Sequence, residues 1–416
     1  MRIQLSSQLR KNTFLVAAAA LLFSAWLFCL QAFLEQWLQR KADLKDLERA
    51  ARVQPLNAET EGRIGLRLLQ PPFDDYSAAE HHLLKSVALN PHDSLAWQKL
   101  ADTYELLGDA ARQNDAVQHA LAAEPKDTQV LWEAANLSIN TDLDGSLQLL
   151  RSVIQHSEQY ASAAIEVAYS ASGHDIEKTM LAVPATTTSR LYLIKWLLDR
   201  NQTEAADRVW PTVLTSEGDI HPRDTFFYFD SLIDRHEVKQ ARMVWSGLLQ
   251  KNPGLEATSS PRSLVTNGDF EGELLNGAFG WRYIPTAGVT ATLDTSTFRS
   301  GTRSLALQID GENLADCGLT QLVPVEPGAR YRLSAWVHGE ELEAAHGVRI
   351  SVSDLYSHAD LLVTDEAVGS FPWRDVAGEF EVPQATDLVK IAFVRSPSVG
   401  IIRGRLWVDD VRIEKQ

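Results

Sequence analysis

The residues with the clearest capacity for catalysis are three acidic side chains, Glu340, Glu341 and Glu343, in the C-terminal third of the sequence. A glycoside hydrolase needs two carboxyl groups that face each other across a cleft. These three lie in one short run, which is more typical of a solvated loop. The sequence also lacks a G-x-S-x-G nucleophile motif and a G-x-x-x-x-G-K-[ST] phosphate-binding motif. We therefore expect that the protein is not an enzyme.

Two neighbouring histidines, His81 and His82, raise the question of a metal site. Adjacent residues of a helix project about 100° apart, so they cannot easily share one ion. No H-E-x-x-H motif or cluster of Cys and His accompanies them, which argues against zinc. The two cysteines, Cys29 and Cys317, lie in segments too different in character to meet, so we expect no internal disulfide.

The charge balance excludes a nucleic-acid surface. The 416 residues include 39 Lys and Arg against 55 Asp and Glu, a formal net charge of −16. Binding to phosphates needs clustered basic side chains, and no basic patch interleaved with aromatic residues is present. A chain of this length also predicts two or three domains rather than one core.

An uncharged apolar run covers residues 13–34. Its 22 residues suffice to cross a hydrocarbon core of about 30 Å at 1.5 Å per residue. Arg2, Arg10 and Lys11 precede the run, so the positive-inside tendency places residues 1–12 in the cytoplasm. We predict a single-pass signal anchor in the inner or cell membrane, with the bulk of the chain periplasmic or extracellular.

A cleaved signal peptide is the alternative for this segment. Its apolar region is usually only 7–15 residues long and ends at a small-residue cleavage site. Here the run is longer, and residues 34–37 (Leu-Glu-Gln-Trp) contain no clear A-x-A pattern. We favour the uncleaved anchor.

Residues 41–256 show helical periodicity with Pro at repeat spacing. The clearest unit is 93–127, and its key positions are Trp97, Leu100, Ala101, Tyr104, Gly108, Ala120 and Pro125. Two antiparallel helices would approach each other at the alanines, turn at the glycine and end at the proline. Pro91 and Pro125 are 34 residues apart. The unit resembles the tetratricopeptide family, which implies a solenoid of helix pairs that binds protein partners.

Later units keep the helical period but lose part of this pattern. Residues 226–253 retain Tyr228 and Trp245 in register, whereas His236 stands where the turn glycine is expected. We predict five to six helix pairs in a curved solenoid. Its aromatic residues are expected to pack between helices rather than to contact a ligand.

After a short linker at 257–263, residues 264–416 alternate apolar and polar side chains between Pro and Gly turns, as in 331–337 and 405–413. This period-2 pattern predicts an antiparallel β-sandwich. The sequence landmarks occur in a set order: 264–271, Gly280-Trp281, 300–305, 328–336, Trp373, 378–383 and 406–411. This succession resembles the carbohydrate-binding jelly rolls of the galactose-binding-like superfamily that are attached to many xylanases and glucanases.

The resemblance implies that the aromatic residues of this domain fall into two groups. Trp281, Trp336, Trp373 and Trp407 occupy positions where the family keeps core aromatics, so we expect all four to pack inside the domain. Sugar binding would then need other rings, exposed on a sheet face, that stack on pyranose rings while polar side chains bind hydroxyls. The candidates are Tyr283, His338, Tyr356 and Phe371.

The resemblance also implies a structural calcium ion that joins the first and last strands. The positions that match the family are Glu271 and Asp410, with Asn267, Asp269 and Ser300 as further candidates. Hard oxygen ligands suit Ca²⁺ better than a transition metal. The alternative is that Asp409 and Asp410 only form a solvated strand end.

The predicted fold class is therefore multidomain: an N-terminal transmembrane helix, an all-α tetratricopeptide-like solenoid and an all-β jelly-roll sandwich. This architecture favours a membrane-anchored periplasmic or cell-surface scaffold that binds glycan through the jelly roll and protein through the repeats. Assembly or export of a surface polysaccharide is a natural setting. The alternative is a structural assembly factor whose jelly roll binds protein and no sugar.

Overall fold

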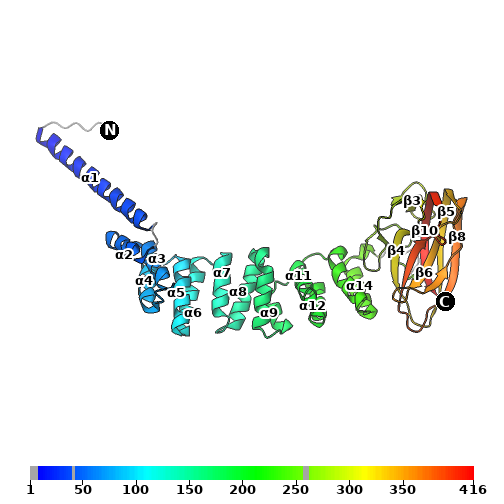
Figure 1. Ribbon diagram of the computed structural model, residues 1–416, viewed down its shortest axis with the longest axis horizontal. Coiled ribbons are helices and arrows are strands. Elements are labelled where there is room, and N and C mark those ends of the chain that lie inside the picture. Colours follow the sequence, from blue (N-terminus) through cyan, green and yellow to red (C-terminus); the bar gives the residue numbers. More distant parts are fainter. Residues whose placement is uncertain (1–7, 40–42, 256–261) are drawn as a thin grey trace. The chain divides into compact units, whose positions relative to one another are not determined.

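A computed structural model describes residues 8–39, 43–255 and 262–416. The predicted tail at 1–12 and linker at 257–263 therefore lie largely outside the described residues. The chain forms two compact units, residues 1–184 and 185–416. Figure 1 shows the helices and strands along the chain. The last four α-helices of the chain belong to the same compact unit as the sandwich. The division between 41–256 and 264–416 stays a prediction.

The first unit is entirely helical in its described part. Its α-helices are α1 (Gln8–Gln39), α2 (Leu44–Val53), α3 (Ala58–Leu68), α4 (Tyr76–Leu89), α5 (Ser94–Leu107), α6 (Ala110–Ala123), α7 (Thr128–Ser138), α8 (Leu143–His156), α9 (Ala161–Ala171) and α10 (Ile176–Thr179). Within α1, Phe14–Leu34 is long and apolar enough to cross a membrane, and a signal sequence would have the same property.

Helices α5 and α6 form the pair expected from the repeat pattern. Asp93 caps α5 by accepting a hydrogen bond from the Ala96 amide at 3.1 Å, and Gly108 ends the helix in the left-handed conformation with φ 72°. Ala101 and Ala120, at the crossing of the two helices, are buried. Most of the first unit follows this scheme, with neighbouring helices packed in chain order, so the region is consistent with helical repeats.

The second unit begins with four further α-helices and continues into the sandwich. The helices are α11 (Thr187–Leu198), α12 (Thr203–Thr215), α13 (Phe226–Asp234) and α14 (Val238–Lys251). The strands are β1 (Arg282–Tyr283), β2 (Val289–Asp294), β3 (Ser304–Glu312), β4 (Asp316–Pro324), β5 (Arg330–Ala344), β6 (Arg349–Asp354), β7 (Asp360–Val363), β8 (Gly369–Glu381), β9 (Leu388–Val394) and β10 (Ile401–Lys415).

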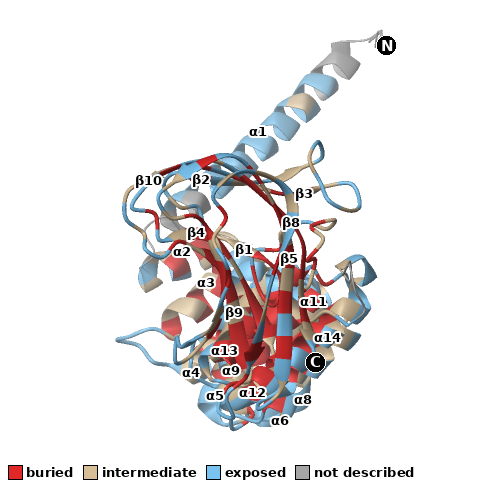
Figure 2. Cartoon of the chain, turned by 90° about the vertical axis from the view of Figure 1, so that its right-hand side faces the viewer, coloured by how far each residue is buried: buried red, intermediate tan, exposed pale blue. Residues whose placement is uncertain are grey.

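The strands build two antiparallel sheets of five strands each, in the orders β1-β4-β9-β6-β7 and β2-β3-β10-β5-β8. Side chains that point between the sheets form one apolar core, which appears as buried segments along the strands in Figure 2. Residues 264–271, which open the sandwich domain, lie against the last strand, β10, since the Val411 amide donates to the Gly268 carbonyl at 2.8 Å. A Cβ at Gly268 would lie only 2.0 Å from the Val411 carbonyl oxygen, so this approach requires glycine.

The predicted fold class is confirmed. The described chain contains one long apolar helix at its N-terminal end, an all-helical region and a C-terminal antiparallel sandwich of two sheets. Period-2 alternation predicted the strands well because each sheet buries only one face.

Candidate functional site

The outer face of the sheet β2-β3-β10-β5-β8 carries an unusual group of aromatic side chains. Along β5, Leu333, Ala335 and Val337 are buried in the core, so Trp336 and His338 project from the opposite face. The same face receives Trp373 from β8 and Trp407 from β10. We call these four residues, Trp336, His338, Trp373 and Trp407, the aromatic face.

His338 lies at the centre of the aromatic face. It is directly opposite Trp407 in the strand register, and their ring centroids are 5.1 Å apart. Trp373 approaches the same imidazole with a centroid distance of 5.6 Å. The Trp407 Nε1 donates to the Asp294 carboxylate at 2.8 Å, which fixes the orientation of the indole. Hydrogen bonds from Ser296 and then from Trp407 lower the pKa of Asp294, so this acceptor is ionised at neutral pH.

The imidazole of His338 makes no hydrogen bond with any described residue, although its ring is only partly exposed. Its Nδ1 atom is buried and has no partner. Buried polar atoms in proteins are nearly always satisfied, and an exception calls for a specific explanation. The buried Nδ1 is out of reach of a ligand, but no described residue uses the Nε2 atom either, and an imidazole beside two indole rings can offer this second nitrogen to a ligand that stacks on them.

A row of exposed polar side chains borders the aromatic face. Arg405 lies two residues before Trp407 on β10, and its Nε donates to the Gln308 side-chain oxygen at 2.8 Å. On the other side, the Arg405 guanidinium is 3.7 Å from the Glu340 carboxylate. This row crosses β3, β10 and β5 and presents both donors and acceptors beside the rings. Flat apolar rings next to such groups form the arrangement that sugar recognition requires.

Trp336 differs from the other rings of the aromatic face because it is already covered. The Arg299 guanidinium lies 4.4 Å from its ring centroid, in cation–π geometry. Trp373 has no such cation over it in the described part of the chain and is therefore the better stacking platform.

The structure separates the four predicted sugar-binding residues. His338 lies on the aromatic face, whereas Phe371, opposite Gly339 in the register, packs against the core between the sheets. The other two lie elsewhere and make internal contacts. The Tyr283 hydroxyl donates to the Val289 carbonyl at 2.8 Å, and the Tyr356 hydroxyl donates to the Ile233 carbonyl at 3.0 Å.

The prediction that all four Trp residues pack inside the domain is only partly right. Trp281 is 1% exposed, stacks on Phe270 and donates its Nε1 to the Asn267 carbonyl at 3.0 Å. Trp407 is also buried, but its ring lies on the outer face of the sheet and is not part of the core between the sheets. For Trp336 and Trp373 the prediction is wrong, because both are partly exposed on that face. Their strand positions point away from the core, and the family pattern alone could not show this.

The residues predicted to bind calcium lie where the opening and closing segments meet. Glu271 accepts hydrogen bonds from the Thr302 amide and hydroxyl, both at 2.6 Å, and from the Arg303 amide at 3.0 Å. The Ser300 amide donates to Asp409 at 3.0 Å rather than to Asp410. Thus the carboxylates hold the 299–303 turn directly by hydrogen bonds to its amides.

The other residues predicted to bind calcium are Asn267, Asp269 and Asp410, and each interacts with neighbouring groups of the protein. The Asn267 side chain accepts from the Gly272 amide at 2.7 Å, and Asp410 pairs with Arg412 at 3.2 Å. Burial raises the pKa of Asp269, and the charges of Glu271 and Asp410 raise it further. All-oxygen donors suit Ca²⁺. However, no described group of three or more His, Cys, Asp or Glu side chains is arranged to hold a metal ion. The structural calcium stays a prediction.

Comparison with known proteins agrees with the geometry of the sandwich. Residues 262–399 match the family described as a carbohydrate binding domain, CBM_4_9. No curated protein matches the chain. Several solved structures match less than half of the chain, all at low sequence identity.

Three of these structures illustrate the range of sequence identity and coverage. The enzymatically active domain of bacteriophage CBA120 tailspike protein 4 is 19% identical over 37% of this chain and 22% of that chain, with a TM-score of 0.29. A structure described as CBM4 structure and function is 13% identical over 36% of this chain and 99% of that chain, also with a TM-score of 0.29. MamA protein is 15% identical over 47% of this chain and 98% of that chain, with a TM-score of 0.32. Scores this low support no conclusion about function.

The C-terminal part of the chain is thus a CBM4-like jelly-roll domain, preceded by an all-helical region that is consistent with repeats.

Proposed function

We propose that the sandwich binds a polysaccharide on its aromatic face. The observation that carries this proposal is His338, whose ring lies between Trp373 and Trp407 and makes no hydrogen bond with any described residue. Trp373 would stack on the apolar side of a pyranose ring while His338 and the row formed by Gln308, Arg405 and Glu340 bind its hydroxyl groups.

We further propose that the chain is a membrane-anchored scaffold of the bacterial envelope. The apolar segment at 14–34 would anchor it, the helical repeats would bind protein partners, and the sandwich would hold a surface polysaccharide during assembly or export. The proposal assigns no catalytic step to the chain.

The second candidate function is an assembly factor whose jelly roll binds protein rather than sugar. One observation favours it. The other sheet of the sandwich already packs on a helix of the same chain, through a Tyr356 hydrogen bond to Ile233 and an ion pair between Arg282 and Asp230.

The test measures binding of the full chain, in a nonionic detergent, to a panel of polysaccharides by affinity electrophoresis. Trp373→Ala should abolish retardation by the cognate polysaccharide while leaving the melting temperature nearly unchanged, since the ring is partly exposed. Tyr192→Ala is the matched control, because Tyr192 is an exposed aromatic on α11, 40% accessible, and should not affect binding. If no polysaccharide retards the wild-type chain, the assembly-factor function takes the place of the first.

A further inference from the structure

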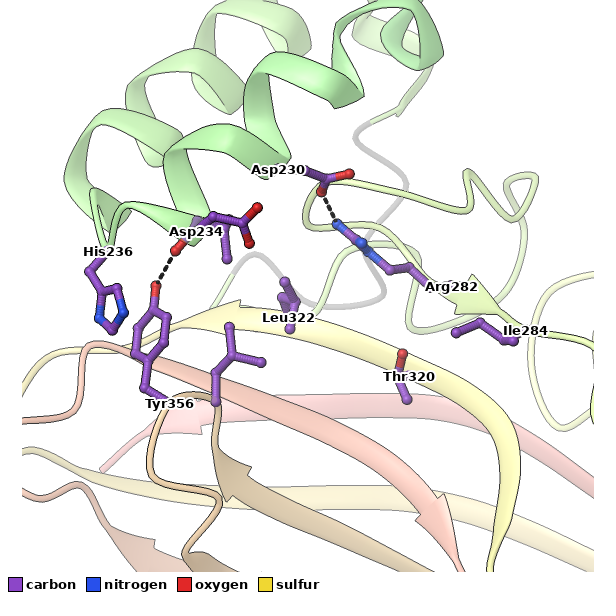
Figure 3. A pocket seen from close by; sticks show the side chains of 10 residues that line it. Asp230, Asp234, His236, Arg282, Ile284, Thr320, Leu322 and Tyr356 are labelled. Atoms are coloured by element: carbon purple, nitrogen blue, oxygen red, sulfur yellow. Dashed lines mark hydrogen bonds and ion pairs between the residues drawn. The ribbon is translucent and has the colours of Figure 1, made fainter. Parts of the chain in front are cut away.

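A pocket of about 610 Å³ lies between α13 and the outer face of the sheet β1-β4-β9-β6-β7 (Figure 3). Asp230 and Asp234 line it from the helix, while Arg282, Leu322 and Tyr356 line it from the sandwich. These walls are supplied by segments far apart in the sequence, all within the second compact unit. The pocket is on the opposite sheet from the aromatic face.

Close packing beside the pocket holds its two walls in place. Phe279 of the sandwich meets Phe229 of α13 edge to face, with ring centroids 4.7 Å apart, and lies 6.2 Å from Trp245 of α14. A Cβ at Gly277 would come within 2.1 Å of the Phe226 ring, so only glycine permits this approach. The pocket is therefore formed by the fold itself before any ligand binds.

Tyr356 closes one end of the pocket. Its ring stacks on His236 at a centroid distance of 3.8 Å. His236 occupies the turn position where a repeat would carry glycine, and it adopts φ 61°, a backbone conformation that favours glycine. The stack on Tyr356 gives a physical reason for a histidine at this strained position.

The charges along the pocket leave one carboxylate unpaired. Asp230 and Arg282 neutralise each other through an ion pair of 2.8 Å. Asp234, one helical turn further along α13, is exposed and forms no ion pair or hydrogen bond with any described residue. Burial raises the pKa of Tyr356 to about 12, and the nearby charges of Asp387, Asp234 and Asp354 add to the shift. The pocket is therefore electronegative.

The floor of the pocket is apolar. It consists of four aliphatic side chains: Ile233, Ile284, Leu322 and Leu355. Ile284 is 66% exposed and would gain from being covered. A ligand with an aliphatic stem and a positive end matches this floor and the Asp234 carboxylate together, as a lysine or arginine side chain does.

We propose that this pocket is a docking site for a basic segment of a protein partner, with a lysine or arginine side chain lying over the aliphatic floor and its charged end at Asp234. An anionic ligand would meet the unpaired carboxylate. A neutral sugar could donate hydrogen bonds to this carboxylate but would not neutralise its charge. The site is independent of glycan binding on the aromatic face.

Isothermal titration of the full chain in a nonionic detergent tests the proposal with two short acetylated peptides, one of alternating leucine and lysine and one of alternating leucine and glutamine. The lysine peptide should bind and the glutamine peptide should not. Asp234→Asn should weaken binding by about fivefold, as expected for a partly exposed ion pair. Asp234→Lys should abolish it and create binding to a leucine–glutamate peptide.

Asp219→Asn is the matched control, because it removes another exposed negative charge from the same compact unit, outside the pocket. Equal weakening by Asp219→Asn and Asp234→Asn would mean that the peptide responds only to the net charge, and would overturn the proposal. Absence of binding to the lysine peptide would also overturn it. Binding of an uncharged oligosaccharide that depends on Asp234 but not on Trp373 would instead make the pocket a glycan site.

Discussion

Replacing His338 with phenylalanine separates the hydrogen-bonding role of this residue from its packing role. Phenylalanine keeps an aromatic ring between Trp373 and Trp407 but removes both ring nitrogens. In the structure the buried Nδ1 has no partner, so the protein itself loses no hydrogen bond. Folding stability and ligand binding should therefore respond in opposite ways to one substitution.

The expected magnitudes follow from the cost of an unpaired polar atom. Burial of such an atom costs about 1–3 kcal/mol, so His338→Phe should leave the free energy of unfolding unchanged or raise it by about 1 kcal/mol. A sugar hydroxyl placed against a phenyl ring would in turn lose its partner. The same range of about 1–3 kcal/mol then corresponds to a loss of affinity of roughly 5- to 150-fold.

Urea unfolding followed by tryptophan fluorescence measures the first effect, and affinity electrophoresis with the polysaccharide that binds the wild type measures the second. His92→Phe is the control, because it adds an equal apolar ring at an exposed turn of the first unit. A loss of stability of about 2 kcal/mol or more would show that the protein does use the imidazole nitrogens. Unchanged affinity would remove His338 from the binding site.

Three further predictions concern other parts of the chain. If calcium joins the ends of the sandwich, chelation should lower the melting temperature of the protein. Asp410→Ala should lower the melting temperature similarly and remove the response to chelator. Identical melting curves with and without chelator would exclude the ion. Burial alone would raise the pKa of Glu61, but hydrogen bonds from Lys85 and His82 outweigh it and lower the pKa. The stability that this group contributes should thus be present above about pH 4.5 and be lost as the pH falls through its lower folded value, and a melting series from pH 7 to 3 should be flatter for Glu61→Gln. A reporter that is active only outside the cytoplasm should be active when fused to the C-terminus, whereas a soluble mature protein that starts near residue 35 would show a cleaved signal peptide.

Local patterns in the sequence sufficed for most of the fold. The helix pair α5 and α6 follows from side chains that act within a few residues, such as the Asp93 cap and the left-handed Gly108. The strands follow from alternation on a half-buried sheet, as on β5 with Leu333 and Val337 inward. These interactions are short in sequence range, and a single sequence records them directly.

The candidate site was harder to predict from the sequence than the fold, because aromatic residues occur both in cores and on binding faces. Trp281 and Trp373 are the same residue type at similar landmarks, yet one is in the core and the other is on the outer face. The parity of β5 was a usable signal, since Trp336 and His338 alternate with the buried Leu333 and Val337. Applied before the family pattern, it would have placed Trp336 outside the core together with His338, which was already predicted to be exposed.

Contacts between distant segments gave no signal in the sequence. Tyr356 was predicted to bind sugar, but its hydroxyl donates to the Ile233 carbonyl, and the two residues are 123 positions apart. Nothing near Tyr356 in the chain indicates a helix above it. The same applies to Arg282, whose partner Asp230 comes from α13.

These distant contacts determine which face of the sandwich remains available. A sandwich of two sheets has two outer faces, and α13 packs on the one formed by β1-β4-β9-β6-β7 through Tyr356 and Arg282. The aromatic face belongs to the other sheet, so the helices of this unit do not compete with a ligand for His338 or Trp373. The two proposed sites, one for a protein partner and one for polysaccharide, therefore lie on different faces. The two sites share no residue and lie on opposite sheets. It follows that the free-energy changes caused by substitutions at Asp234 and at Trp373 should add when the two substitutions are combined.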